Sequence, residues 1–219
     1  MNLDEPGDRL PTLQGDGLRL RWLTAQDAAA VFELFSDPEV LRFTAVKPLI
    51  TLADSEDFIA DIQRGFREGD LYQWGIELAD QIVGTCTLYD VDLRHRRAGL
   101  GFAVVKRMWG RRVVSRAVPA VLDFAFDSLD LHRVEADADP RNEGSLRALR
   151  RLGFREEGFL RERYFQYGEA QDAVMFGLLR TEWPGARFQG GAGLGSAVRT
   201  DPADPADGGS GPGSAAGGP

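Results

Sequence analysis

"MWGRRVVSRAV", residues Met108–Val118, joins a strand-like run to the most strongly helical run of the chain. The run before it, GLGFAVV (Gly99–Val105), is predicted as a strand. After it, apolar residues recur at helical spacing from Val113 to Leu129, which predicts an amphipathic helix. A helix N-terminus offers free N–H groups and a partial positive charge to anions. The stretch is therefore either a phosphate-binding turn or the basic start of a solvated helix.

Outward from this turn, the pattern predicts an α/β fold with one mixed central sheet of about seven strands and flanking helices. The predicted strands are Gly17–Leu23, Tyr72–Leu78, Gln81–Val91, Gly99–Val105, Leu131–Asp139, Phe154–Gln166 and Asp172–Leu179. Helices are predicted after Thr24, Asp37, Thr51 and Asn142, besides the one from Val113. We expect a single domain over residues 16–183.

The two ends of the chain differ from this domain in composition. Residues 1–15 lack the cationic start and apolar run of a signal peptide, and we expect them to form a flexible segment. Residues 184–219 are rich in Gly and Pro, which predicts a disordered tail. The chain contains no apolar run of about 18 residues, so we expect no membrane partner and a cytoplasmic location.

The net charge and the few cysteine and histidine residues argue against a nucleic-acid partner and a metal site. The net charge of −8 disfavours a nucleic-acid partner and favours cationic substrates. Cys86 is the single cysteine, and we interpret it as a core residue of a strand. His95 and His132 are far apart without zinc-like spacing, so we expect no metal.

The run HRVEADADP places four charged residues on one face of its strand: Arg133, Glu135, Asp137 and Asp139. Carboxylates so close together repel, so a partly buried one should have a raised pKa that suits a base. Glu135, deeper in the strand, is the best candidate. The alternative is that Arg133 offsets Glu135 and the aspartates are solvated.

Four further polar residues are candidates for chemistry. Asn142 and Ser145 lie one turn apart at a helix start, where both could be local caps. Tyr164 and Tyr167 are candidate phenolic acids, although strand tyrosines often serve packing alone.

The ordered combination of these motifs resembles the GNAT N-acetyltransferase superfamily, in its RimJ/RimL-type branch. The likeness covers residues 18–183 and rests on GLGFAVV, WGRRVVSRA, LHRVEA, Asn142, Ser145, LGF and the late Gly168 and Asp172. It implies acetyl-CoA as co-substrate and an amine acceptor, either a small molecule or a protein N-terminus, attacked directly in a ternary complex. It also implies a monomer or homodimer.

The resemblance assigns roles to individual residues. The strand Phe102–Val105 would part from its neighbour and pair with the pantetheine arm, with the Val104 N–H facing the oxyanion. Glu135 would be the base, and Ser145 or Tyr164 the acid. The implied cofactor-binding residues are Phe102, Val104, Val105, Gly110, Arg111, Arg112, Val113, Val114, Ser115, Asn142 and Ser145.

The chain departs from the family pattern at three positions. Arg112 stands where the turn usually has glycine, Gly99 where a glutamate is frequent, and Leu149 where many members carry a tyrosine acid. These departures support an alternative, a degenerate module that binds a ligand or partner without catalysis. A nucleotide- or nucleic-acid-binding domain is a third interpretation, suggested only by the arginine cluster. The sequence does not identify the acceptor.

Overall fold

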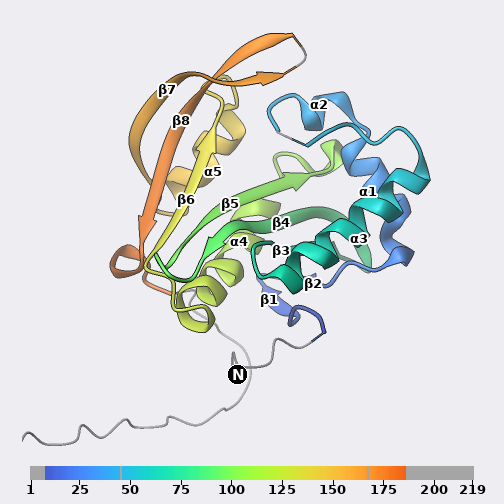
Figure 1. Ribbon diagram of the computed structural model, residues 1–219, viewed down its shortest axis with the longest axis horizontal. Helices are drawn as coiled ribbons and strands as arrows, with labels where there is room; N and C mark the ends of the chain where they lie inside the picture. The colour runs from blue at the N-terminus through green and yellow to red at the C-terminus, as the bar shows by residue number, and fades with distance from the viewer. Residues whose placement is uncertain (1–7, 45, 167, 186–219) are drawn as a thin grey trace, which may run out of the picture. The chain divides into compact units, whose positions relative to one another are not determined.

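An eight-stranded mixed sheet runs through the chain in the order β1-β2-β3-β4-β5-β6-β8-β7 (Figure 1). It is seen in a computed structural model that describes residues 8–44, 46–166 and 168–185. The strands are β1 (Leu13–Gly15), β2 (Leu18–Arg21), β3 (Tyr72–Leu78), β4 (Gln81–Asp92), β5 (Arg97–Val104), β6 (Arg133–Ala138), β7 (Arg155–Gln166) and β8 (Glu169–Leu179). The predicted α/β class is confirmed, with one strand more than expected.

The additional strand, β1, lies within residues 1–15, which were predicted to be flexible, and corrects that prediction for its residues 13–15, whereas residues 1–7 lie outside the described residues. Leu13–Gly15 pair antiparallel with β2, and Leu10 before them is buried. The indole of Trp74 donates a hydrogen bond of 2.9 Å to the Pro11 carbonyl oxygen. Gly17, at φ +66, makes the tight turn into β2. Apart from residues 184 and 185, the predicted tail lies outside the described residues.

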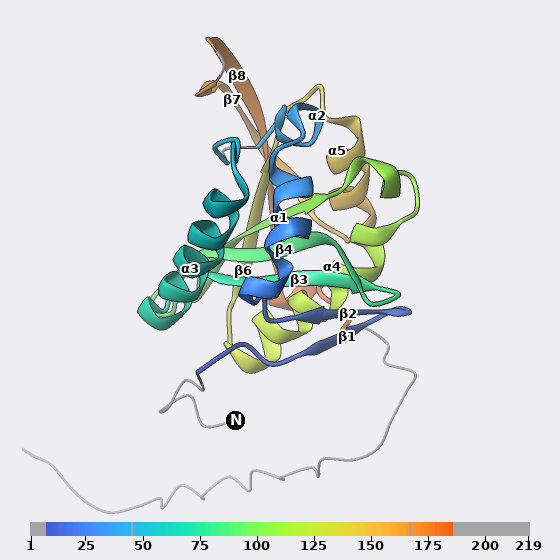
Figure 2. The ribbon, with the colours of Figure 1, turned by 90° about the vertical axis from the view of Figure 1, so that its right-hand side faces the viewer.

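Helices cover both faces of the sheet (Figures 1 and 2). They are α1 (Ala28–Phe35), α2 (Pro38–Leu41), α3 (Leu52–Glu68), α4 (Val113–Asp123) and α5 (Glu143–Arg151). The predicted helix from Val113 to Leu129 is α4 continued by a π-helical turn, η3 (Phe124–Ser128). No helix in the described ranges has the length and apolar character needed to cross a bilayer.

Alternation along β3 separates the two faces. Trp74 points to the α4 face, where its ring lies 5.2 Å from that of Phe124. Gln73, next to it, therefore points to the opposite face, which α1 and α3 cover. On that face the rings of Phe35 and Phe58 join α1 to α3 at 4.9 Å. The sheet is thus buried on both sides, with a polar residue in its α3-facing layer.

An arginine ties the start of the helical layer to the sheet. The Arg21 guanidinium donates to both carboxylate oxygens of Asp27, at 2.7 and 2.9 Å, and to Glu77 at 2.6 Å. Burial acts to raise the pKa of Asp27, but hydrogen bonds from Arg21 and Thr24 lower it overall. The ionised Asp27 carboxylate therefore stabilises the junction between β2, β3 and α1.

Replacing this carboxylate should destabilise the fold in a pH-dependent way. We expect Asp27→Asn to lower the free energy of unfolding by about 1–3 kcal/mol at pH 7, because Arg21 loses an ionised partner. A lowered folded-state pKa gives stability that is present above the unfolded value, about 3.9, and is lost as pH falls. Urea unfolding should therefore show the difference shrinking below about pH 4.

Asp80→Asn is the matched control, because Asp80 is 93% exposed and its ion pair with Arg19 is long, at 3.5 Å. It should change stability by less than about 0.5 kcal/mol. Equal effects of the two substitutions would contradict a structural role of the Asp27 pair.

Candidate active site

Strands β5 and β6 are parallel neighbours that part along their length. They pair only at Arg97–Gly99 with Arg133–Glu135. Beyond Gly99, β5 remains paired with β4, and β6 remains paired with β8 up to Ala138. Each strand is therefore held from its outer side while the edges that face each other separate (Figure 1). The parting predicted for the strand Phe102–Val105 is present.

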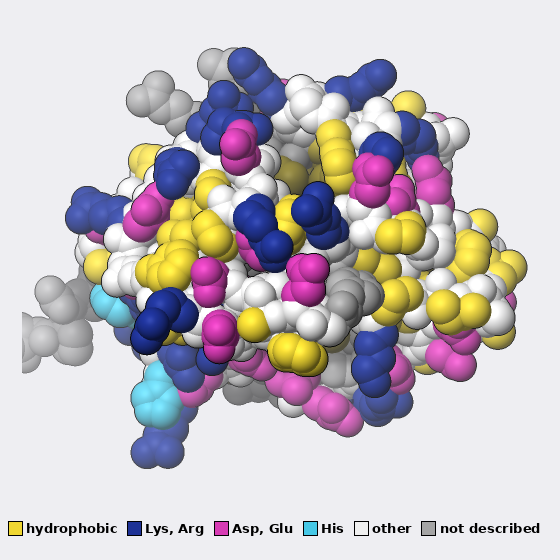
Figure 3. All heavy atoms as spheres, turned by 90° about the horizontal axis from the view of Figure 1, so that it is seen from above, with side chains coloured by type: hydrophobic (Ala, Val, Ile, Leu, Met, Phe, Trp, Pro, Cys, Tyr) yellow, Lys and Arg dark blue, Asp and Glu magenta, His cyan; other side chains and the backbone are white. Residues whose placement is uncertain are grey.

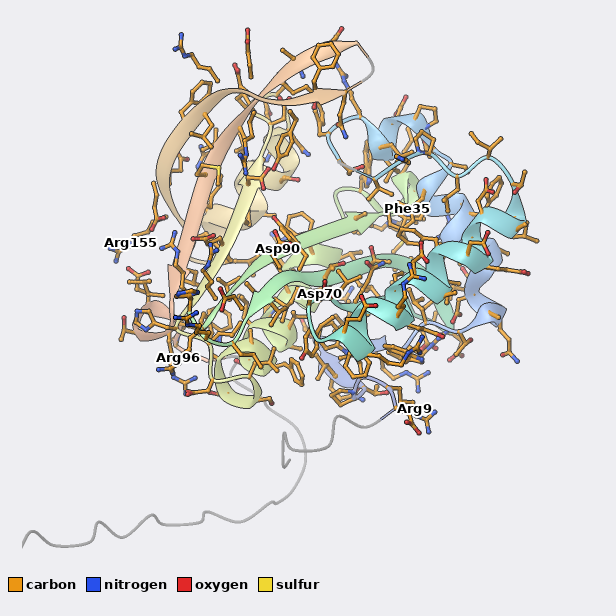
Figure 4. The ribbon with its side chains drawn as sticks, viewed as in Figure 1. Arg9, Phe35, Asp70, Asp90, Arg96 and Arg155 are labelled. Carbon is orange, nitrogen blue, oxygen red and sulfur yellow. The ribbon has the colours of Figure 1, made fainter. Side chains whose placement is uncertain are left out.

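A cavity of about 530 Å³ occupies this gap. Its walls include residues 100–103 of β5, residues 136–138 of β6 and Asp139 directly after β6. From the α1 and α3 face, Phe35 (labelled in Figure 4) and Phe58 reach it, and α5 contributes Ser145. The cavity thus has access to groups from both layers around the sheet.

The backbone of β5 presents hydrogen-bonding groups to this gap. The Val105 N–H donates to the Val83 carbonyl oxygen at 2.9 Å, so Val105 bonds to β4. Alternation in an antiparallel pair turns the N–H groups of Phe102 and Val104 the other way, toward β6. Of the three predicted strand contacts, Phe102 and Val104 are thus suitably placed. The N–H of Val105 is not, because β4 already uses it.

The turn before α4 contains Arg112, which stands where the family usually has glycine. Arg112 has φ +58 and ψ +26, the left-handed conformation that favours glycine, and Gly110 has φ +75. Arg112 is the N-cap residue of α4, and its side chain makes no capping hydrogen bond. An arginine therefore adopts the geometry of the family's glycine, and the first N–H groups of α4 are left without a side-chain cap.

The basic residues around the turn divide into two groups. Three are bound within the protein: Lys106 to Glu39 at 2.6 Å, Arg107 to Glu33 at 2.9 Å, and Arg116 to the Asp16 carbonyl oxygen at 2.6 Å. The side chains of Arg111 and Arg112 are exposed and have no partner among the described residues. Two free guanidinium groups therefore lie beside an uncapped helix N-terminus, which is an arrangement suited to phosphate.

The structure places Glu135 outside the cavity. Its carboxylate oxygens lie 2.7 Å from Arg133 and 3.5 Å from Arg97, in the part of β6 that is still paired with β5. Asp137, two residues further along, lines the cavity and accepts a hydrogen bond of 3.3 Å from the Tyr89 hydroxyl. Asp139 also lines it but is held by Arg141. The geometry therefore favours Asp137, not Glu135, as the available carboxylate.

Tyr89 is a site residue that the sequence analysis missed. Its ring lies over Gly99, where an added Cβ would come within 2.3 Å of the ring. This explains the missing glutamate at position 99, because Tyr89 fills that space. Tyr89 is the cross-strand partner of Gly99 in the β4–β5 pair, and only this register shows that its ring fills the space above that glycine.

Two tyrosines share the Asp137 carboxylate. Burial raises the pKa of Tyr89 far above its usual value, and the charges of Asp137 and Tyr164 add to this effect. Burial also raises the pKa of Tyr164, again with Asp137 contributing. Both phenols are therefore neutral hydrogen-bond donors at neutral pH, directed at one carboxylate. The predicted Tyr164 lies in the cavity wall, whereas Tyr167 is outside the described residues.

Asn142 and Ser145 both line the cavity. The Asn142 side chain also caps α5, since its Oδ1 accepts a hydrogen bond of 3.1 Å from the Ser145 N–H. Asn142 therefore both caps α5 and lines the cavity. Its hydrogen bond to the Ser145 N–H helps to position Ser145 at the cavity.

The cavity is acidic. Its lining includes four carboxylates, Asp61, Asp137, Asp139 and Asp172, and no lysine or arginine among the described residues. On the face seen from above, basic and acidic side chains are interspersed (Figure 3). Asp61 and Asp139 are paired with Arg64 and Arg141, so it is Asp137 and Asp172 that favour a cationic ligand at the cavity itself.

Comparison with known proteins identifies a family. The model of the acetyltransferase (GNAT) domain matches residues 17–155. The chain is 33% identical over 178 residues to the uncharacterized N-acetyltransferase p20 of Bacillus licheniformis, covering 80% of this chain and all of p20. It is 24% identical to the spermidine N(1)-acetyltransferase of Escherichia coli (strain K12), covering 72% of this chain and 83% of that enzyme.

Solved structures share the fold. RimJ of Mycobacterium smegmatis, in complex with CoA-disulfide, superposes with a TM-score of 0.73 at 24% identity, covering 80% of this chain and 88% of RimJ. At this identity the likeness supports the architecture alone.

The left-handed Arg112 predicts that a glycine would stabilise the turn. We expect Arg112→Gly to raise the free energy of unfolding by about 1 kcal/mol, because a left-handed backbone costs about 1–2 kcal/mol for residues with a Cβ. Arg111→Gly is the neighbouring control, since Arg111 does not have a positive φ. It should be neutral or destabilising in the same urea titration. A stability of Arg112→Gly at or below that of Arg111→Gly would contradict the strain.

Proposed function

The chain belongs to the acetyltransferase (GNAT) domain family, and from that premise we propose that it is an N-acetyltransferase that moves the acetyl group of acetyl-CoA to a primary amine in the β5–β6 cavity. The observation that carries the proposal is the parting of β5 and β6. It leaves the N–H groups of Phe102 and Val104 directed toward β6, beside a cavity with carboxylates on its wall. We retain the expected cytoplasmic location as part of this proposal.

The residues of the chain fit acetyl-CoA along its length. The uncapped N-terminus of α4, with Gly110 to Ser115, would hold the pyrophosphate, and the free guanidinium groups of Arg111 and Arg112 would pair with its charge. The free edge of β5 at Phe102, with the Val104 N–H, would pair with the amide groups of the pantetheine arm, whereas the Val104 carbonyl oxygen already accepts a hydrogen bond of 2.7 Å from the Trp109 indole. Asn142 and Ser145 would lie at its thiol end.

The acceptor amine would bind on the acidic side of the cavity. Most primary amines are protonated at neutral pH, so the carboxylates would attract them, but only the neutral amine is a nucleophile. We assign the proton-accepting role to Asp137, in place of Glu135. Tyr89 donates to Asp137, and Tyr164 lines the same cavity, so the Asp137 carboxylate is held at the wall where an amine can reach it.

Acetyl-CoA, when bound, supplies the thioester carbon that the amine attacks and the sulfur that leaves. The Val104 N–H would donate to the carbonyl oxygen as negative charge develops on it. As the N–C bond forms and the C–S bond breaks, Asp137 takes a proton from nitrogen, directly or through water. Ser145 or Tyr164 gives a proton to sulfur.

The alternative of a binding module without catalysis rested on Arg112 and on the missing tyrosine at Leu149. Arg112 has the backbone conformation of the usual glycine, and Tyr164 offers a phenol in the same cavity. Both observations favour the enzyme over the binding module.

Arg111 and Arg112 should determine cofactor affinity. We expect Arg111→Ala and Arg112→Ala each to raise the Kd of acetyl-CoA by about tenfold, because each removes about 1.4 kcal/mol of charge-assisted contact. Isothermal titration calorimetry measures this directly, and N-acetylcysteamine thioester, which lacks phosphate, should show no such change.

Lys106→Ala and Arg107→Ala are the controls, since their charges are already paired with Glu39 and Glu33. Each should leave the Kd within about threefold of wild type. Failure of the wild-type chain to bind millimolar acetyl-CoA would refute the proposed function.

Asp137 should matter to turnover more than Glu135. We expect Asp137→Asn to lower kcat/KM for an accepted amine by about 100-fold, because the amine loses its proton acceptor. The Kd of acetyl-CoA should stay within about twofold, which separates the effect from misfolding.

Glu135→Gln should change kcat/KM by less than about threefold, since Glu135 lies outside the cavity. A larger loss in Glu135→Gln than in Asp137→Asn would return the base to Glu135.

A further inference from the structure

A polar strip lies in the sheet beneath α3, away from the Asp137 wall. It consists of Gln73 on β3 and Thr85 and Thr87 on β4, all of which line the cavity. Gln73 and Thr87 are direct cross-strand partners. Gln73 is 6% exposed and Thr85 is 2% exposed, among apolar neighbours such as Phe58 of α3. The mechanism proposed above uses none of the three residues of the strip.

The Gln73 amide has an unmet hydrogen bond. Its Nε2 is buried and has no hydrogen-bond partner in the described structure. A buried donor of this kind destabilises a protein, and native proteins rarely keep one without a reason. Leucine would fill the same volume without this penalty. Two other buried atoms of the described structure, Ser55 Oγ and Arg180 Nη1, also lack a partner, but of these three residues only Gln73 lines the cavity, where a ligand can supply the missing acceptor.

The other two glutamines of the cavity wall, Gln166 and Gln171, have structural roles. The Gln166 amide donates to the Thr44 carbonyl oxygen at 2.6 Å. The Gln171 amide donates to the Arg42 carbonyl oxygen at 3.4 Å. Both connect the β7–β8 hairpin to the loop after α2. Gln73 also lines the cavity, but it differs from both because its amide nitrogen has no acceptor in the described structure.

The strip lies far from the reacting end of the cavity. Gln73 is on β3 and Asp137 on β6, and the sheet order puts β4 and β5 between them. Two inter-strand spacings of about 4.8 Å, together with the wider gap between the parted β5 and β6, place the two residues at least about 14 Å apart. An extended peptide of about four residues spans that distance. A ligand that reaches both ends must therefore be elongated.

Resting on the acetyltransferase function proposed above, we propose that Gln73, Thr85 and Thr87 form a second acceptor subsite, which binds a neutral carbonyl or hydroxyl oxygen of the acceptor. The Nε2 group only donates hydrogen bonds, so its partner must be an acceptor atom. Amide carbonyls and sugar hydroxyls qualify. A protonated alkyl polyamine carries donors only and leaves Nε2 unpaired.

The preference should therefore be for acceptors that carry such oxygens at a distance from the amine. Sites built to hydrogen-bond a substrate group discriminate strongly against an analogue that lacks it, because the buried partner is then left unpaired. The subsite thus selects among amines that the Asp137 wall alone would accept equally.

The test compares three acceptors of similar length with the full chain: a tetrapeptide amide with a free N-terminus, an aminoglycoside and a straight-chain alkyl diamine. We expect wild type to prefer the peptide or the aminoglycoside over the diamine by at least about tenfold in kcat/KM. In Gln73→Leu, KM for the preferred acceptor should rise by about tenfold or more while KM for the diamine stays unchanged. The preferred acceptor then shows whether the oxygen is an amide carbonyl or a sugar hydroxyl.

A stability measurement separates ligand binding from a structural role. Removing an unpaired donor should raise the Tm of Gln73→Leu by about 2–4 °C, whereas Gln171→Leu, which removes a satisfied hydrogen bond, should lower it. Thr87→Val is a second probe at a less buried position and should raise KM in the same selective pattern. Calorimetric titration of each acceptor in the presence of CoA gives the same comparison without turnover.

The outcomes distinguish the two proposals. Equal KM changes for all three acceptors, or no change in Gln73→Leu and Thr87→Val, would overturn the subsite while leaving the acetyltransferase intact. Absence of acetyl-CoA binding would refute the acetyltransferase function and the subsite with it.

Discussion

The parting of two parallel strands after a three-residue pairing is the constraint on which the rest of the site depends. The β4 and β8 strands hold the outer sides of β5 and β6, so the gap cannot close by a shift of either strand alone. Main-chain N–H groups inside a domain normally find partners in the sheet. Here those of Phe102 and Val104 point toward the parted β6 instead. The position of the opening is set by where the β5–β6 pairing stops, at Gly99 and Glu135.

The site has a positively charged part and a negatively charged part, although the chain as a whole has a net charge of −8. Free guanidinium groups at Arg111 and Arg112 stand beside an uncapped helix N-terminus, and carboxylates line the cavity. The neighbouring cations, Lys106 and Arg107, are neutralised by acidic partners. A net-charge argument alone therefore misses the local positive field that an anionic cofactor needs.

The sequence predicted the order of elements and the turn, because strand alternation and helical spacing are local properties. The sequence analysis predicted Glu135 as the base and not Asp137. Both residues lie on one face of β6, and only the point where β5 and β6 part determines which of them lines the cavity. Tyr89 was missed for a similar reason, since its role depends on the two glycines across the strand pair and on a carboxylate from β6. Long-range register, which single-sequence patterns do not encode, accounts for both.

Gln73 illustrates a different limit. In the sequence it occupies one position of an ordinary alternating strand, and a polar residue there suggests an exposed face. The structure buries that face under α3, so the amide is enclosed with an unmet donor. Local rules and the fold disagree at this residue, and such disagreements concentrate at functional sites because function can require a group that stability does not. Since the other two glutamines of the cavity wall satisfy their amides, the conflict is specific to the side chain that borders the cavity beneath α3.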